Sequence, residues 1–274
     1  MAGMLEPAVL LVTAGSIRTM QGALVTGAGK RIGRALALAL AEEGYFVFVH
    51  HNNSVADARQ TVASIVKRGG RARAMKADLS SATQAAGLVA RCRARDVVLT
   101  TLVNSASLFE LDRAPAVTSA DFDRHMTINL RAPLLLSQSL ARQLPRGERG
   151  LIVNLLDQKL ANLNPDFLSY TLSKIGLHGL TMLLAQALAP RIRVAGIAPG
   201  LTLRSGSQTD QVFAAQHVAN PLGVGVMPED LARALKFIVA TPSYTGDTII
   251  VDSGEHLTGR PRDIAFHAAN NKKK

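Results

Sequence analysis

Short apolar or β-branched runs alternate with longer Ala- and Leu-rich stretches along most of the chain, and this alternation is the strongest constraint on its fold. The runs that we expect to form strands are 22–26, 45–50, 71–77, 97–104, 151–155, 193–197 and 248–251. The stretches that we expect to form helices are 33–43, 54–68, 81–94, a long helix within 120–143, one that ends near 189, and 228–240. Strands separated by helices form βαβ units. The sequence therefore predicts an α/β fold: a single Rossmann-type doubly wound parallel sheet with helices on both faces.

The stretch 33–43 allows two interpretations. Leu36, Leu38 and Leu40 alternate with single residues, which is the period of a strand. The residues between them are alanines, and Ala, Leu and Glu are strong helix formers. We therefore expect a helix that is buried on several sides and ends at Gly44.

No linker or change of composition divides the chain of 274 residues, so we expect one domain over residues 21–258. Residues 1–20 are expected to be a leader or an upstream extension. Their apolar run at 7–17 lacks the preceding basic residue of a signal peptide. Residues 259–274 are expected to be a C-terminal tail. The stretch 199–227 has no clear periodicity, so it is either a disordered loop or a lid over a substrate; we favour the lid.

The net charge of +11 raises the question of a polyanionic partner. The arginines are scattered, and no basic block is interleaved with aromatic residues, so we expect no nucleic acid. No apolar run approaches the roughly 18–20 residues of a membrane span, so we expect no membrane partner. Cys92 is the only cysteine, which excludes an intramolecular disulfide and favours a cytoplasmic location. The histidines show no metal-ligand spacing, so no metal is expected.

A glycine-rich turn, 26–33, joins the first expected strand to the first expected helix. Gly27 and Gly29 permit positive φ angles and a close approach of the backbone, and the helix that follows offers unpaired N–H groups to a phosphate. The glycines are not spaced as G-x-G-x-x-G. The position of the turn between a strand and a helix nevertheless predicts that it binds a nucleotide.

The end of the second expected strand indicates which nucleotide. A site for NAD places an acidic residue there, whereas the 2′-phosphate of NADP requires its absence and a nearby cation. No carboxylate lies between the start of this strand and Asp57, and Lys30 and Arg31 lie in the adjacent turn. The strand instead ends in five polar residues: His50, His51, Asn52, Asn53 and Ser54. These features favour NADP(H) as the cofactor; a polar loop without a ligand is the alternative.

Tyr170 and Lys174 are four positions apart, so on a helix they share one face, with Cβ atoms about 5–6 Å apart. An ammonium beside a phenol favours the phenolate and lowers the phenol pKa from about 10 toward neutrality. Tyr170 is therefore a candidate proton donor. The spacing also arises by chance on helix faces, so the rest of the chain must support it.

The glycine-rich turn, the alternation of strands and helices, and the spacing of Tyr170 and Lys174 together make the chain resemble the short-chain dehydrogenase/reductase family over residues 21–254. The family motif Thr-Gly-x-x-x-Gly-x-Gly is matched by Thr26, Gly27 and Gly33, with Arg31 at the middle glycine. Further family positions are matched in order by Asp78-Leu79, Asn104-Ser105-Ala106-Ser107, Asn129 and Pro199-Gly200. The resemblance implies an NADP(H)-dependent reductase.

Asp157 stands 13 residues before Tyr170, where the family usually has a serine. A serine hydroxyl donates a hydrogen bond to a carbonyl that is being reduced, and an ionised carboxylate cannot. Asp157 can instead accept hydrogen bonds from an N–H-rich substrate, or carry a proton if its pKa is raised. The aspartate disfavours an ordinary ketone reductase and favours a nitrogen heterocycle; a solvated carboxylate at the end of a strand is the alternative.

Within the family, the chain resembles the pteridine reductases and the dihydromonapterin and dihydrofolate reductases. The shared features are Lys30-Arg31, His50, Ser107 with Phe109, and the spacing of Asp157, Tyr170 and Lys174. The resemblance implies that a pterin ring binds between Phe109 and the nicotinamide. The alternative is that Phe109 is an aromatic residue of the hydrophobic core. It also implies that Arg31 and Ser107 contact both cofactor phosphate and substrate, and that the protein is a homotetramer.

The resemblance implies three sets of site residues. The expected catalytic residues are Asp157, Tyr170, Lys174 and Asn129. The residues expected to bind the cofactor are Gly27, Lys30, Arg31, Ile32, His50, His51, Asn52, Asn53, Ser54, Asp78, Leu79, Asn104, Ser105, Ala106, Ser107, Tyr170, Lys174, Pro199 and Gly200. The residues expected to contact the substrate are Arg31, Ser107, Phe109, Asp157, Tyr170 and Leu201.

We therefore predict that hydride passes from NADPH to a ring carbon of a 7,8-dihydropterin or dihydrofolate. Tyr170, or a water between Asp157 and Tyr170, is expected to protonate the neighbouring ring nitrogen. Lys174 is expected to bind the nicotinamide ribose, and Asn129 to hold a water and the backbone of a proton relay. One alternative is an NADPH-dependent reductase of ketones or acyl-carrier substrates. A second is a non-catalytic NADP(H)-binding regulator, which the intact Asn129, Tyr170 and Lys174 disfavour.

Overall fold

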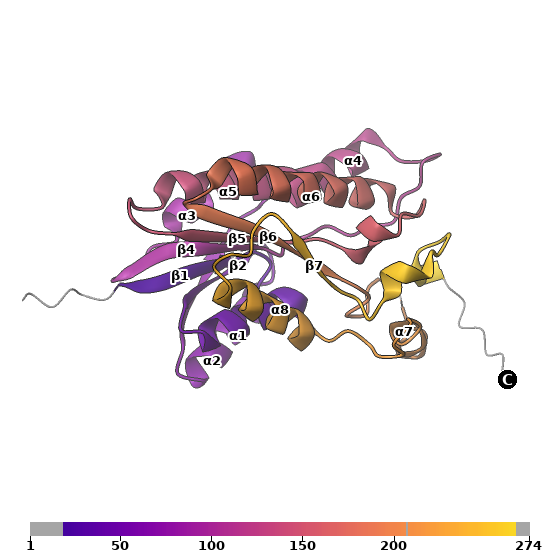
Figure 1. The fold of residues 1–274 in the computed structure, drawn as a ribbon, viewed down its shortest axis with the longest axis horizontal. Coiled ribbons are helices and arrows are strands. Elements are labelled where there is room, and N and C mark those ends of the chain that lie inside the picture. Colours follow the sequence, from indigo (N-terminus) through magenta and orange to yellow (C-terminus); the bar gives the residue numbers. More distant parts are fainter. Residues whose placement is uncertain (1–18, 207, 267–274) are drawn as a thin grey trace, which may run out of the picture.

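Seven parallel strands form one sheet in the computed structural model, which describes residues 19–206 and 208–266 (Figure 1). In chain order the strands are β1 (Met20–Val25), β2 (Phe46–His51), β3 (Arg71–Lys76), β4 (Val97–Asn104), β5 (Gly150–Leu155), β6 (Ile192–Pro199) and β7 (Thr248–Val251). Their order across the sheet is β3-β2-β1-β4-β5-β6-β7. The predicted Rossmann-type fold is confirmed. The expected leader lies outside the described residues up to position 18, and Met20 already belongs to β1.

Helices cover both faces of the sheet (Figure 1). One face carries α1 (Arg31–Glu42), α2 (Val55–Lys67) and α8 (Pro228–Ala240), and the other carries α3 (Ala82–Arg91), α4 (Ser119–Met126), α5 (Ala132–Gln143) and α6 (Leu168–Leu188). Successive side chains of a strand point to opposite faces. The neighbours Leu24 and Val25 of β1 therefore enter separate cores, Val25 beside α1 and α8, and Leu24 beside α3 and α5.

The stretch 33–43 is helical, as predicted in spite of its alternating leucines. Leu36 and Leu40, which lie one turn apart, are fully buried, and Leu38 between them is half-buried. The intrinsic preference of Ala and Leu for helix therefore outweighs the period of two.

The order of the strands determines where a ligand can bind. The chain runs outward from β1 to β3 and then returns to place β4 on the other side of β1. The loops that follow β1 and β4 diverge at this point and leave a crevice beyond the carboxyl ends of the strands, which is the usual ligand site of an open parallel sheet.

Two segments differ in detail from the secondary structure that the sequence predicts. The long helix within 120–143 is divided into α4 and α5 by a π-helical turn at Thr127–Arg131. The stretch 199–227 contains the short helix α7 (Asp210–His217), whose N-terminus is capped by the hydroxyl of Thr209. The described part of that stretch is therefore not a structureless loop. Short 3₁₀ turns are formed by Gln158–Ala161, Glu255–Thr258 and Ile264–Phe266.

None of the helices in the described part of the chain is long and apolar enough to cross a membrane. Within the same residues, 19–206 and 208–266, no group of three His, Cys, Asp or Glu side chains is arranged to hold a metal ion.

Candidate active site

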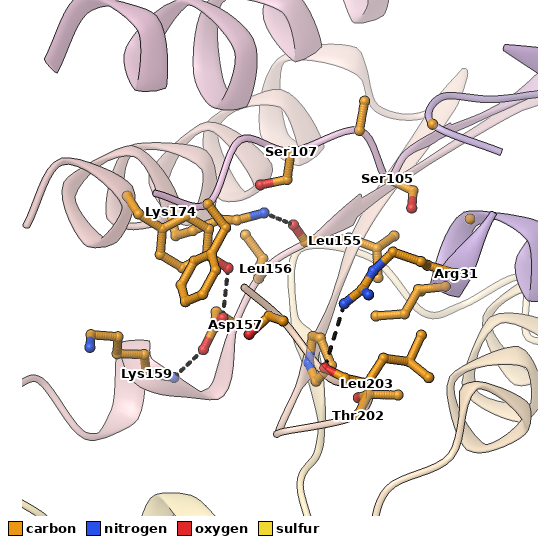
Figure 2. A pocket seen from close by; sticks show the side chains of 18 of the residues that line it. Arg31, Ser105, Ser107, Leu155, Leu156, Asp157, Lys159, Lys174, Thr202 and Leu203 are labelled. Atoms are coloured by element: carbon orange, nitrogen blue, oxygen red, sulfur yellow. Dashed lines mark hydrogen bonds between the residues drawn. The ribbon is translucent and has the colours of Figure 1, made fainter. Parts of the chain in front are cut away.

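A cavity of about 500 Å³ opens at the carboxyl edge of the sheet (Figure 2). Its walls come from the turn after β1, the ends of β2, β4, β5 and β6, the first turns of α6, and the segment after β7. This volume lies within the roughly 300–1,000 Å³ of small-molecule sites. Most of the predicted site residues line the cavity; those that do not are His51, Asn53, Ser54, Asn104 and Asn129.

The glycine-rich turn packs its backbone directly against neighbouring backbone. Gly27 has a φ of 64°, and a Cβ there would lie 3.0 Å from Cα of Ala106 at the end of β4. A Cβ on Gly33, in the first turn of α1, would overlap the carbonyl oxygen of Gly27. The hydroxyl of Thr26 accepts hydrogen bonds from the N–H groups of Ser105 and Ala106 at 2.9 and 3.0 Å. Glycines at positions 27 and 33 therefore hold the turn against both α1 and β4.

The N-terminus of α1 fits an anionic group. Its N-cap residue, Lys30, makes no side-chain hydrogen bond to the helix, so the side chain does not occupy the first N–H groups. Those groups carry a partial positive charge and lie beside the cavity. The turn and the helix N-terminus together fit the phosphates of a dinucleotide.

Arg31 stands at the family's middle glycine with a φ of 56°, in the left-handed region that glycine adopts without strain. Its guanidinium points toward the segment after β6 (Figure 2). Nη1 donates to the carbonyl oxygen of Arg204 at 2.7 Å, and Nη2 makes a long contact of 3.5 Å with that of Leu203. Arg31 thus joins the nucleotide turn to the segment that follows β6.

His50 is bound to the backbone through both ring nitrogens. Nδ1 accepts from the N–H of Gly27 at 3.1 Å, and Nε2 lies 3.1 Å from the carbonyl oxygen of Ala77, which assigns the proton to Nε2. Burial lowers the pKa of His50 to about 4, so the ring is neutral at pH 7. The expected cofactor residue His50 therefore has no free ring nitrogen for a phosphate, and it fixes the shape of the turn instead.

Of the other polar residues at the end of β2, only Asn52 lines the cavity. His51 is buried, and its Nδ1 lies 3.1 Å from the carbonyl oxygen of Asn52. Asn53 and Ser54 are not part of the cavity wall. Asn52 is therefore the residue of this group that is placed to meet a cofactor.

At the ends of β3 and β4, too, some of the predicted cofactor residues line the cavity and others do not. Asp78 and Leu79 line the cavity, and the Asp78 carboxylate accepts from the hydroxyl and N–H of Ser80, which lowers its pKa. Asn104 is buried and donates to Oδ1 of Asn154 at 2.8 Å. Asn104 therefore connects β4 to β5 and does not face the cavity.

Asn129 lies on the π-helical turn and holds the segment after β4. Its Oδ1 accepts from the N–H of Leu108 at 2.7 Å and from the hydroxyl of Ser107 at 3.2 Å. Its Nδ2 donates to the carbonyl oxygen of Leu108 and to the hydroxyl of Ser173, both at 2.9 Å. Because Asn129 is buried away from the cavity wall, it acts by positioning Ser107 and the backbone beside it.

Asp157 and Tyr170 form a hydrogen-bonded pair at the base of the cavity. The Tyr170 hydroxyl donates to Oδ2 of Asp157 at 2.6 Å, and the N–H of Lys159 donates to Oδ1 at 2.9 Å. Burial raises the pKa of both groups, and the nearby Asp157 charge raises that of Tyr170 further. Both groups therefore favour their protonated forms more than they would in water.

Lys174 and Tyr170 share one helix face as the spacing predicts, and Nζ of Lys174 lies 5.5 Å from the centroid of the Tyr170 ring. Its Nζ donates to the carbonyl oxygen of Leu155 at 2.6 Å (Figure 2). Burial lowers the pKa of Lys174 to about 8. The prediction that the ammonium lowers the pKa of Tyr170 is therefore wrong for this structure, in which burial and Asp157 control the phenol.

Phe109 lies at the cavity mouth and is 39% exposed, so it is not a core aromatic. Its ring stacks on Phe167 with centroids 4.2 Å apart, and the edge of Tyr170 meets it at 4.7 Å. The exposed part of the ring offers an apolar surface beside the hydroxyl of Tyr170.

Glu255 is an acidic lining residue that the sequence analysis missed. It is 5% exposed, and Oε2 accepts from the N–H of Leu201 at 3.1 Å. Oε1 lies 3.5 Å from Nη1 of Arg260. Burial raises the pKa of Glu255 to about 7. The sequence shows a single glutamate among polar residues after β7, which carries no signal of burial.

The C-terminal segment forms a further wall, although the sequence assigns it to a tail. Residues 263–265 line the cavity. Nζ of Lys159, which is 2% exposed, donates to Oδ2 of Asp263 at 2.8 Å. The guanidinium of Arg262 makes two hydrogen bonds of 2.7 Å to the carboxylate of Asp166. These two ion pairs hold the segment against the site.

Known proteins are similar to this chain along most of its length. The profile of the short chain dehydrogenase family matches residues 21–212. An uncharacterized oxidoreductase of Methylorubrum extorquens is 34% identical over 240 residues, which span 85% of this chain and 96% of that protein. The 3-oxoacyl-(acyl-carrier-protein) reductase of Synechocystis sp. is 30% identical over 241 residues, spanning 86% of this chain and 97% of that protein.

A solved structure is also similar. FolM alternative dihydrofolate reductase 1 from Brucella canis, complexed with NADP, matches with a TM-score of 0.83 and 39% sequence identity. The match covers 88% of this chain and 96% of that chain.

Proposed function

The chain belongs to the short chain dehydrogenase family, and from this membership we propose that it is an NADP(H)-dependent oxidoreductase that reduces a dihydropterin or dihydrofolate to the tetrahydro form. The cofactor is supported by similar structures that hold NADP. It is also supported by the glycine turn, the free N-terminus of α1 and the neutral Asn52 at the end of β2. When bound, NADPH supplies the hydride.

The observation that carries the substrate assignment is the hydrogen bond between Tyr170 and Asp157. A serine in place of Asp157 would present a donor to a carbonyl oxygen, whereas a carboxyl group can accept from ring and amino N–H groups or deliver a proton. A pterin ring carries N–H groups and a ring nitrogen that must be protonated as the neighbouring carbon is reduced. The similarity to an enzyme named as a dihydrofolate reductase supports the same assignment.

The site residues then have distinct roles. When Asp157 is protonated, the hydrogen bond to Tyr170 reverses its direction: Asp157 donates to Tyr170 and Tyr170 donates to the ring nitrogen. One proton is thus consumed with each hydride, and Asp157 is left ionised until it is protonated again from water. Burial raises the pKa of Asp157, which favours the protonated carboxyl group that this path requires. The exposed face of Phe109 stacks on the pterin ring. Lys174, whose Nζ lies beside the end of β5, binds the ribose of the nicotinamide.

A reductase of ketones or acyl-carrier substrates is the second candidate, because a 3-oxoacyl reductase is 30% identical to this chain. The discriminating experiment measures NADPH oxidation in parallel with 7,8-dihydrobiopterin, dihydrofolate, a 3-oxoacyl thioester and a simple ketone. We expect activity with the pterins. Oxidation with only the carbonyl substrates would show that the proposed substrate is wrong.

The segment that follows β6 lies beside the site. We propose that the stretch 199–227 is a lid, since Leu201 and Leu203 line the cavity and Arg31 holds the backbone of 203 and 204. The homotetramer and the cytoplasmic location remain predictions.

A further inference from the structure

A second hollow adjoins the main cavity on the side of its mouth. Arg31, Ser107, Phe109, Leu203 and Ser205 line both, so the two spaces are continuous. Arg204 and Gly206 complete the wall of the second space, which we call the outer subsite. A ligand whose ring occupies the main cavity can therefore extend a substituent past Phe109 into the outer subsite.

The two spaces differ in charge. The main cavity is lined by charges of both signs: the acidic residues are Asp78, Asp157, Glu255 and Asp263, and the basic ones are Lys30, Arg31, Lys159 and Lys174. Among the described residues that line the outer subsite, the charged ones are Arg31 and Arg204. The outer subsite is therefore positively charged, whereas charges of both signs line the main cavity, and this difference favours a ligand with an anionic group at its outer end.

The guanidinium of Arg204 is available to such a group. Its Nη1 donates to Oδ1 of Asp210 at 2.7 Å, but the two side chains are 51% and 93% exposed. An exposed pair of this kind contributes only about 0–1 kcal/mol, so a ligand carboxylate competes with Asp210 at little cost. A guanidinium has several N–H donors and binds a carboxylate in a bidentate manner.

Arg31 fixes Arg204 at the mouth of the cavity. Its Nη1 donates to the carbonyl oxygen of Arg204 at 2.7 Å, which holds the backbone of this residue in the wall that Arg204 shares with Phe109. The half-exposed ring of Phe109 lines both the main cavity and the outer subsite and so offers an apolar surface to a linker that passes from one to the other.

We propose that the outer subsite binds an anionic tail on the pterin substrate, with Arg204 contacting a carboxylate, so that the chain prefers a folate-type substrate over a pterin with a neutral side chain. This inference rests on the proposed function. The cofactor phosphates are another source of the same anionic chemistry, and they must be distinguished from the tail by experiment.

The test compares kcat/KM for dihydrofolate and for 7,8-dihydrobiopterin, which carries no carboxylate, at saturating NADPH. The Arg204→Gln variant is expected to lower the ratio of dihydrofolate to dihydrobiopterin about tenfold, through KM, which corresponds to about 1.4 kcal/mol. Arg233→Gln is the matched control, because Arg233 also forms an exposed ion pair with an aspartate, Asp230, but lines neither space. The affinity for NADPH is measured in parallel from its fluorescence.

The outcomes separate the two proposals. If the wild type reduces both substrates and Arg204→Gln leaves the ratio within that of the control, the tail subsite is wrong and the proposed function stands. If Arg204→Gln weakens NADPH by as much as dihydrofolate, the anion is a cofactor phosphate and the subsite is again overturned. If the wild type reduces neither pterin, the proposed function fails and the subsite fails with it.

Discussion

The hydroxyl of Tyr170 lies 2.6 Å from Oδ2 of Asp157 and donates a hydrogen bond to it. The backbone N–H of Lys159 donates to the other carboxylate oxygen, Oδ1, and this second hydrogen bond fixes the orientation of the Asp157 carboxylate. We propose that this pair is the chemical centre of the cavity; its two members are 13 residues apart in the chain.

We expect Tyr170→Phe and Asp157→Asn each to lower kcat with a dihydropterin about 100-fold or more, since both remove a member of the proton path. Steady-state NADPH oxidation measures the effect. The affinity for NADPH should change little in Asp157→Asn, which shows that the cofactor site is intact. Wild-type rates in both variants would falsify the proposed proton path.

The preference for NADPH should depend on Asn52 and not on its neighbour. We expect Asn52→Asp to lower the ratio of kcat/KM for NADPH to that for NADH about tenfold, because a carboxylate there repels the 2′-phosphate and accepts from the ribose hydroxyls of NADH. Asn53→Asp adds the same charge one residue away, outside the cavity wall, and is the comparison. Equal effects of the two substitutions would contradict the placement of Asn52.

How far the sequence predicts the fold depends on whether the signal is local. The alternation of strands and helices and the glycine turn are local patterns, and they place the sheet and the nucleotide side of the site. The helix α7 spans eight residues and is started by a Thr209 cap within a segment that has no periodicity. The π-helical turn at 127–131 could not be predicted either, because the sequence pattern of this stretch is that of a continuous helix.

The site is predicted less completely, because burial and long-range contact decide its chemistry. Lys174 shares a helix face with Tyr170, but its ammonium bonds to Leu155 on a neighbouring strand, which no spacing reveals. From the sequence, His50 is expected to bind the cofactor. In the structure, both its ring nitrogens are hydrogen-bonded to the backbone, one to the N–H of Gly27 and the other to the carbonyl oxygen of Ala77. Asp263 reaches the site from 104 residues beyond its partner Lys159.

The buried carboxyl group of Glu255 should make stability depend on pH. Burial raises the pKa of Glu255 from 4.5 to about 7, so the folded protein holds this proton more tightly than the unfolded chain does. The resulting stabilisation is fully present below pH 4.5 and is lost as the pH rises through about 7. We expect Glu255→Gln, which keeps an acceptor for the N–H of Leu201, to be more stable than the wild type at pH 8 by on the order of 1–3 kcal/mol. The difference should shrink toward pH 5 in chemical denaturation.

His50 contributes with the opposite sign. Its pKa is lowered from 6.5 to about 4, so its stabilisation is present above pH 6.5 and is lost as the pH falls through about 4. The two effects partly cancel in the wild type, and Glu255→Gln should therefore be the more acid-sensitive protein. Glu229→Gln, on the exposed first turn of α8, is the control and should follow the wild type. A constant difference between Glu255→Gln and the wild type at all pH values would exclude a titrating Glu255.

The ion pair between Lys159 and Asp263 should be essential for the C-terminal wall. Lys159→Met leaves the carboxylate of Asp263 without its partner, and we expect the free energy of unfolding to fall by about 3 kcal/mol. The double variant Lys159→Met/Asp263→Leu removes both charges and should recover much of this loss. Denaturant unfolding of the single and double variants measures it. A double variant that is less stable than Lys159→Met would show that the pair is not the source of the effect.

The left-handed backbone of Arg31 sets stability against activity at one position. Glycine there removes a steric strain of about 0.5–1 kcal/mol, after its larger unfolded-chain entropy is subtracted. Arg31→Gly should therefore raise Tm slightly while it lowers kcat/KM, because the contacts to Leu203 and Arg204 are lost. The side chain at this position thus places a cation beside both spaces at the expense of a strained backbone.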